Sequence, residues 1–189
     1  VINSDRYELV EELSDIYPTE LIISCNLMIE LIFNDNYKNK RIINFVNSIV
    51  DSVKCKEIIN ILLMSDRYKL DETELSGFVN ESISEFNKQE EMNVIKTFKN
   101  CSCGIISTCY KLGEGTDIKE IDTVCISQTM KAEIRIFQSV LRAHTKDEST
   151  PDKRAVILIP IVTDNEYKPY RSDDEHSFDK RMLVLSIKT

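Results

Sequence analysis

The sequence is poor in the residues that mark cofactor loops, membrane spans and nucleic-acid wrapping surfaces. Its 189 residues include four glycines, four prolines, two histidines and no tryptophan. It has no apolar run of the roughly 18 residues that a membrane-spanning helix requires, and acidic residues outnumber basic ones, 32 to 24, for a formal net charge of −8. We therefore predict no membrane span and no wrapping of nucleic acid by bulk attraction. Any contact with nucleic acid must be local.

The cysteines and histidines do not have the spacing of a metal site. A structural zinc site needs cysteine pairs two to four residues apart, with a second pair or histidines at a matching distance. Cys101 and Cys103 have only one residue between them, where a zinc site has two to four, and His144 and His176 lie far along the chain. We predict no bound metal, and reduced, buried thiols of a cytosolic-type compartment. The six cysteines are Cys25, Cys55, Cys101, Cys103, Cys109 and Cys125.

Apolar patterning alternates between the strand and helix periods along most of the chain. Short β-branched runs predict buried strands at 41–49, 103–109, 122–127 and 154–162. Spacings of three and four predict helices at 21–33, 48–62, 84–98 and 128–144. Alternating strands and helices with right-handed crossovers give a mostly parallel sheet with helices on both faces. The sequence therefore predicts a three-layer α/β domain.

The two ends of the chain read as appendages to that domain. We expect a helical lead-in segment over 1–37, the α/β domain over 38–165, and a loop followed by the start of a helix over 166–189. The helix is expected because Phe178, Met182 and Leu185 have helical spacing. We expect the chain to be a piece of a longer polypeptide, with this helix leading into missing sequence.

Two of the four glycines, Gly113 and Gly115, lie together in the stretch STCYKLGEGTDI, residues 107–118. A Walker A phosphate loop is absent, since no glycine is followed at the required distance by Gly-Lys-Ser or Gly-Lys-Thr. A dinucleotide loop needs a third glycine where Ile118 stands. An ordinary turn remains one explanation for the glycines. A close approach of backbone amides to an anion is the other.

The stretch IISTCYKLGEGTDIKEIDTVCIS resembles motif V of superfamily 2 helicases, in the Leu-x-Glu-Gly-x-Asp-Ile form of some DNA translocases. KRIINFVNSI resembles motif IV, and FQSVLRAHTKDESTPDKRAVILIP resembles motif VI with the strand after it. The resemblance covers roughly residues 40–163. It implies that the α/β domain is RecA-like, namely the second (C-terminal) motor domain of such an enzyme.

The resemblance also implies roles for residues at the carboxyl ends of strands, where ligands of open α/β sheets gather. The nucleic-acid backbone would be bound by hydroxyls and amides of four residues, without base readout. Gly115 and Asp117 would face the cleft between the motor domains and contact the nucleotide ribose. The four backbone-binding residues are Asn47, Ser48, Ser107 and Thr108.

Motif VI usually reads Gln-x-x-Gly-Arg-x-x-Arg and directs guanidinium groups at the γ-phosphate of ATP. Gln138 and Arg142 match this pattern and are the implied catalytic and nucleotide-binding residues. The sequence departs from it at Leu141, in place of glycine, and at Thr145, in place of the second arginine. Either Arg142, alone or with Lys146, acts on the γ-phosphate of ATP in place of the two arginines, or ATP hydrolysis is weak.

The resemblance implies an ATP-dependent helicase or translocase whose fragment here is inactive alone. ATP and Mg²⁺ would be held mainly by a missing N-terminal RecA-like domain of the same polypeptide, and the other partner would be DNA or RNA. A duplex-DNA translocase of a restriction or remodelling machine, and a degenerate non-catalytic interaction module, remain alternatives. The Asn- and Ile-rich composition is typical of an AT-rich genome, such as that of a large DNA virus or a protist. The expected location is the cytoplasm or nucleus, or the virion of a virus.

Overall fold

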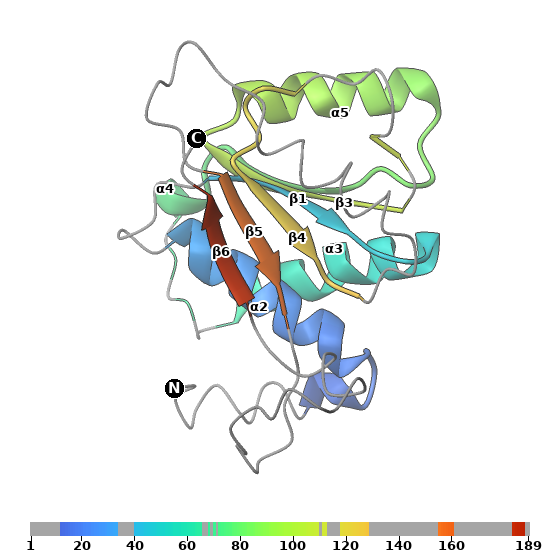
Figure 1. Cartoon of the computed structure of the whole chain (residues 1–189), viewed down its shortest axis with the longest axis vertical. Coiled ribbons are helices and arrows are strands. Elements are labelled where there is room, and N and C mark those ends of the chain that lie inside the picture. Colours follow the sequence, from blue (N-terminus) through green and yellow to red (C-terminus); the bar gives the residue numbers. More distant parts are fainter. Residues whose placement is uncertain are drawn as a thin grey trace.

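The computed structural model describes residues 12–33, 40–65, 68, 70, 72–109, 111–112, 118–128, 155–160 and 183–187. These form an α/β fold in which one sheet lies between helices (Figure 1). The predicted three-layer architecture is confirmed.

The sheet has six strands in the order β2-β3-β1-β4-β5-β6. The first five in this order are parallel to one another, and β6 is antiparallel to β5. The strand bounds are β1 Arg41–Phe45, β2 Phe78–Ser82, β3 Cys103–Thr108, β4 Thr123–Ile126, β5 Ala155–Ile159 and β6 Leu183–Ile187. The strands predicted near 41, 103, 122 and 154 are therefore present, with β1, β3 and β4 in the middle of the sheet.

Helices cover both faces of the sheet. α2 (Thr19–Phe33) and α3 (Ile49–Met64) lie on one face, and α5 (Lys88–Asn100) lies on the other (Figure 1). The short α4 (Glu72–Leu75) precedes β2. α5 begins with a capping box, in which Asn87 accepts from the Glu90 amide and the Glu90 carboxylate accepts from the Asn87 amide. Both α3 and α5 begin at the carboxyl edge of the sheet, because α3 follows β1 and α5 precedes β3.

The core has two apolar layers, one on each face of the sheet. Adjacent residues of β1 point to opposite faces, so Ile42 packs with α2 and α3 while Ile43 packs with Phe98 of α5. Gly104 lies where strand and helix approach closely, since a Cβ there would be 2.7 Å from the Val79 carbonyl oxygen. A larger residue at this position would push β2 and α5 apart.

The helix predicted within 166–189 is wrong over Leu183–Ile187, which form β6. The run LVLSI pairs with β5, from Ala155↔Ile187 to Ile159↔Leu183. Its β-branched residues suit a strand, and the edge of β5 supplies backbone partners that the spacing of Met182 and Leu185 could not reveal. Phe178 lies outside the described residues, as does nearly all of the helix predicted over 128–144.

In the part of the chain that the structure describes, no helix has the length and apolar character needed to cross a membrane. All six cysteines are buried, and none of them forms a disulfide bond. Burial raises the pKa of the Cys25 thiol well above its usual value and that of Cys125 to about 12. These thiols are therefore protonated and unreactive, as expected of core cysteines.

Candidate functional site at the carboxyl edge of the sheet

The carboxyl ends of the three central strands lie side by side. Phe45 at the end of β1 is in register with Thr108 of β3 and with Ile126 of β4. The chain leaves these strands as Val46–Ser48, Cys109 and Ser127–Gln128. The segments that resemble motifs IV and V are thus brought together with the segment that leads to motif VI, as the sequence predicted.

Ser48 caps the N-terminus of α3. Its hydroxyl oxygen accepts from the Asp51 amide at 3.0 Å, and its hydroxyl donates to the Asp51 carboxylate at 2.7 Å. Asn47 is exposed and Ser48 is half-buried, so both can meet a ligand from solvent. The helix dipole favours an anion here. The negative charge of the Asp51 carboxylate would repel an anion, and the Lys54 ammonium, 3.8 Å from that carboxylate, partly offsets this charge.

A buried polar network joins the carboxyl ends of β1, β3 and β4. The Asn44 side-chain NH₂ donates to the Ser107 hydroxyl at 3.2 Å, and the Ser127 hydroxyl donates to the Asn44 side-chain oxygen, Oδ1, at 2.5 Å. Asn44 and Ser107 are fully buried and Ser127 nearly so. The Asn44 side chain therefore links β1 to both neighbouring strands, β3 and β4, through two buried serine hydroxyls.

Ser107 and Thr108, expected to bind phosphate oxygens, are both fully buried in this conformation. Ser107 is engaged with Asn44, whereas the Thr108 hydroxyl has no hydrogen-bond partner. An unpaired buried hydroxyl costs free energy and marks a position that is worth explaining functionally. Their contact with nucleic acid remains a prediction, and it requires that the cover over these two side chains shift. Asn47 and Ser48 need no such shift.

A second hydroxyl cluster, which the sequence interpretation missed, ties β2 to α3 and to the chain after β3. The Cys109 amide donates to the Ser84 hydroxyl at 2.7 Å. The Ser52 hydroxyl lies 2.7 Å from that of Ser84 and 2.8 Å from that of Ser82. Ser82 is the last residue of β2 and Ser84 follows it, in the pattern that placed the other candidates, but the mixed sequence before residue 80 did not distinguish a strand from a loop. The cluster orients the first residue of the glycine-containing loop.

Both ends of the glycine-containing loop are anchored in the core. Leu112 and Ile118 are buried in the same apolar cluster as Phe98. Leu112 has a φ of 60°, a left-handed conformation that costs a branched residue free energy. Lys111 donates to the Phe86 carbonyl oxygen and lies 4.0 Å from the Glu91 carboxylate. The predicted ligands Gly115 and Asp117, with Gly113, lie outside the described residues, between these anchors.

Gln128 is the last described residue before the segment that resembles motif VI. Its side-chain oxygen accepts from the Asn47 amide at 2.8 Å, and its side-chain amide donates to the Asp51 carboxylate at 3.3 Å. The predicted catalytic residues Gln138 and Arg142 lie outside the described residues, ten and fourteen positions further along. Sequence reasoning did not single out Gln128, because only the folded chain brings it beside the start of α3.

The opposite, amino edge of the sheet is fastened by charged side chains. The Asp122 carboxylate accepts from the Lys40 amide at 2.8 Å and from the Arg41 amide at 3.1 Å. Burial raises the pKa of Asp122 from 3.8 to about 6, although these amides and the Arg41 charge act to lower it. The Arg41 guanidinium donates to the carbonyl oxygens of Phe98 and Cys101. This edge holds β1, β4 and the end of α5 together.

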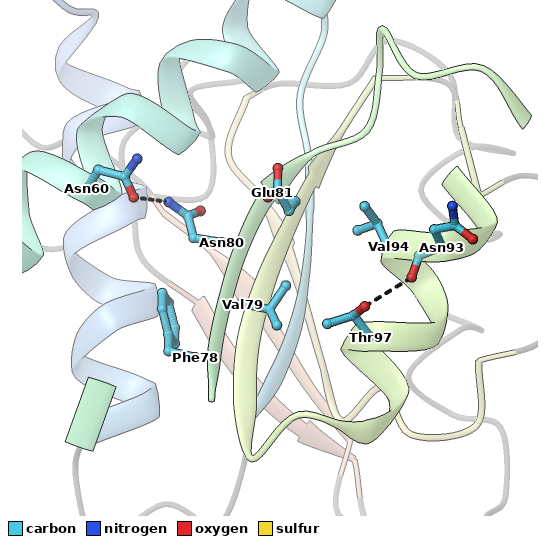
Figure 2. A pocket seen from close by; sticks show the side chains of 8 residues that line it. All are labelled: Asn60, Phe78, Val79, Asn80, Glu81, Asn93, Val94 and Thr97. Carbon is cyan, nitrogen blue, oxygen red and sulfur yellow. Dashed lines mark hydrogen bonds between the residues drawn. The ribbon is translucent and has the colours of Figure 1, made fainter. Parts of the chain in front are cut away.

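A surface hollow of about 440 Å³ lies along β2, between α3 and α5 (Figure 2). Asn80 reaches across it to Asn60 with a 2.8 Å hydrogen bond, and Thr97 bonds back to Asn93 within α5. The hollow is shallow and lined mainly by neutral side chains. Among the described residues, no group of three or more His, Cys, Asp or Glu side chains could hold a metal ion.

A family model for the helicase conserved C-terminal domain matches residues 23–146. The chain belongs to this family. The resemblance to the second motor domain of superfamily 2 enzymes is thereby confirmed, and the match spans the segments that resemble motifs IV, V and VI. It also includes most of α2, which was predicted to be a lead-in segment. No curated protein matches the chain at a significant level.

Solved structures share the fold of this helicase C-terminal domain. A DNA-bound, ATP-dependent Type ISP restriction-modification enzyme, LlaBIII, superposes with a TM-score of 0.67 at 20% identity over 87% of this chain. T4 UvsW superposes with a TM-score of 0.53 at 16% identity over 90% of this chain. The C-terminal part of the Fun30 ATPase domain superposes with a TM-score of 0.51 at 14% identity over 85% of this chain. This chain spans only 11%, 31% and 51% of the three, respectively.

Proposed function

We propose that this helicase C-terminal domain is the second motor domain of an ATP-dependent superfamily 2 DNA or RNA helicase or translocase. The observation that carries the proposal is the convergence of the motif IV and motif V segments at the carboxyl edge of one parallel sheet, beside Gln128, from which the chain continues toward motif VI. That edge presents amides, hydroxyls and a helix N-terminus, which bind phosphates without reading bases.

The nucleic-acid backbone would run along the exposed part of this edge. Asn47 and Ser48 are accessible there, at the start of α3. Ser107 and Thr108 would join them when ATP closes the cleft between the motor domains and shifts the residues that cover them. The unpaired Thr108 hydroxyl supports this step, because a phosphate oxygen would give it the partner that it lacks.

ATP would bind on the other side of the same edge. The glycine-containing loop is anchored in the core at Leu112 and Ile118, and between these anchors Gly115 and Asp117 would contact the ribose. Gln138 and Arg142 would face the γ-phosphate, where a guanidinium stabilises the charge that develops during transfer. Bound ATP supplies the phosphoanhydride bond, and Mg²⁺ would be held by the N-terminal motor domain. The chain alone would not hydrolyse ATP.

The domain, as we propose it, includes α2 and extends to β6. Leu21, Ile22, Met28 and Ile29 of α2 share one buried cluster with α3 and the sheet, so α2 is core rather than appendage. The polypeptide would act in the cytoplasm or nucleus, or be packaged in the virion if the source is a virus.

The first test is ATP hydrolysis by the full-length polypeptide with and without a DNA or RNA oligonucleotide. We expect stimulation by nucleic acid, and a loss of about 10³-fold or more in kcat for Arg142→Ala, as for an arginine finger. Arg135→Ala, a nearby arginine outside the motif VI pattern, is the matched control and should retain activity. Equal turnover in wild type and Arg142→Ala would contradict the assignment, and no turnover in wild type would favour the non-catalytic interaction module.

A duplex-DNA translocase is the second candidate, favoured by the superposition on a restriction-modification enzyme that is bound to DNA. Displacement of a third strand from duplex DNA, without separation of the duplex strands, would support translocation. Strand separation on a forked substrate would support a helicase.

A further inference from the structure

One side chain, that of Gln128, bridges two of the segments that resemble helicase motifs. Gln128 follows β4 and lies beside the start of α3, which follows β1. It contacts the proposed nucleic-acid edge directly. It is also joined through the chain to the segment that carries Gln138 and Arg142.

Both polar atoms of the Gln128 carboxamide, the oxygen and the nitrogen, form hydrogen bonds. The oxygen accepts the amide proton of Asn47, the residue just before the N-cap of α3, at 2.8 Å. The nitrogen donates to the Asp51 carboxylate at 3.3 Å, and Asp51 in turn accepts from the Ser48 hydroxyl at 2.7 Å. Gln128 thus holds Asn47 directly and Ser48 through Asp51.

The residue before Gln128 is fixed as well. The Ser127 amide donates to the Phe45 carbonyl oxygen at 3.1 Å, and the Ser127 hydroxyl bonds to Asn44. These hydrogen bonds tie the end of β4 to the end of β1 and, through Gln128, to the start of α3. Gln128 is the last residue of this hydrogen-bonded network along the chain that leads toward Gln138 and Arg142.

We infer that Gln128 is a positioning residue that couples the nucleic-acid edge at Asn47 and Ser48 to the arginine-bearing segment after β4. The Asn47 amide is a donor that a phosphate oxygen would seek, and the Gln128 oxygen occupies it in this structure. A phosphate that arrives at this amide displaces or redirects the Gln128 carboxamide, and the change passes along the chain toward Arg142. This inference rests on the proposed function and names the connection between its two ligand sites.

The experiment measures how strongly an oligonucleotide stimulates ATP hydrolysis by the full-length polypeptide. Gln128→Leu keeps the approximate volume and removes both hydrogen bonds. We expect the maximal stimulation of kcat to fall about tenfold, the size expected when two hydrogen bonds are lost. The oligonucleotide concentration for half-maximal stimulation should change much less. Gln89→Leu is the matched control, because Gln89 is an exposed glutamine of α5 that bonds to Asn93 at 3.3 Å.

A donor-acceptor exchange distinguishes coupling from mere stabilisation of the fold. Gln128→Glu places a second carboxylate beside Asp51 and should reduce stimulation as Gln128→Leu does. In the double variant Gln128→Glu with Asp51→Asn, the side-chain amide introduced at position 51 can donate to the carboxylate introduced at position 128. That pair restores the bridge with its direction reversed, so we expect stimulation to recover toward the wild-type value.

Stimulation of Gln128→Leu equal to wild type would overturn the inference, as would an equal loss in Gln89→Leu or no recovery in the double variant. These outcomes leave the proposed function intact, since wild type is still stimulated. A wild-type enzyme whose ATP hydrolysis ignores nucleic acid would overturn both.

Discussion

The two edges of the sheet are built from different chemistry. At the amino edge, the Asp122 carboxylate and the Arg41 guanidinium bind backbone amides and carbonyl oxygens. At the carboxyl edge, the buried groups are neutral, since Asn44 bonds to the Ser107 and Ser127 hydroxyls, and the Asp51 carboxylate lies at the more exposed start of α3. Partly buried charges hold their partners firmly, whereas neutral groups can exchange partners at lower cost. The difference supports our proposal that the ligands bind at the carboxyl edge.

The largest expected effect concerns the amino edge and its dependence on pH. Since burial raises the pKa of Asp122 from 3.8 to about 6, the folded chain binds more protons than the unfolded chain between these values. The stabilisation from this group is complete only below about pH 3 and is lost as the pH rises through 6. Relative to Asp122→Asn, wild type should lose about 3 kcal/mol of unfolding free energy between pH 3 and pH 8. Urea denaturation across this range measures it. A constant difference between the two proteins would contradict the shifted pKa.

A smaller effect is expected at the carboxyl edge from Asn44→Leu. The replacement has a similar volume but leaves the buried Ser107 and Ser127 hydroxyls without their shared partner. We expect a loss of about 2 kcal/mol in unfolding free energy, with little dependence on pH because no member of this network ionises near neutrality. Asn93→Leu, at an exposed position of α5, is the control and should change stability by no more than about 0.5 kcal/mol. Equal losses would show that the buried network has no special role.

The smallest effect separates structure from binding at two helix N-termini on the same edge. Ser48→Ala and Asn87→Ala each remove an N-cap, of α3 and α5 respectively, and each should cost about 1 kcal/mol in stability. Only Ser48→Ala should also weaken binding of an oligonucleotide by the full-length polypeptide, measured by fluorescence anisotropy. Weaker binding by both variants would place the nucleic acid across the whole edge rather than at α3.

Most of the sheet could be predicted from the sequence because β1, β3, β4 and β5 are short, nearly continuous apolar runs. β6 could not, since the residues around it have helical spacing and only pairing with β5 makes them a strand. The order of the motifs located the carboxyl edge. It did not reveal that Ser107 and Thr108 are buried, because burial depends on tertiary packing that motif order does not record. Asn44 and Gln128 gave no signal, as their partners lie 63 to 83 positions away.

The most direct test of the difference between the edges is hydrogen–deuterium exchange of the full-length polypeptide, with and without an oligonucleotide and a non-hydrolysable ATP analogue. Amides of Asn47–Asp51 and Ser107–Leu112, at the carboxyl edge, should exchange more slowly when both ligands are bound. Amides of Lys40, Arg41 and Asp122, at the amino edge, should be unchanged. Protection confined to the amino edge, or absent from both, would contradict the assignment of the carboxyl edge as the ligand-binding side of this domain.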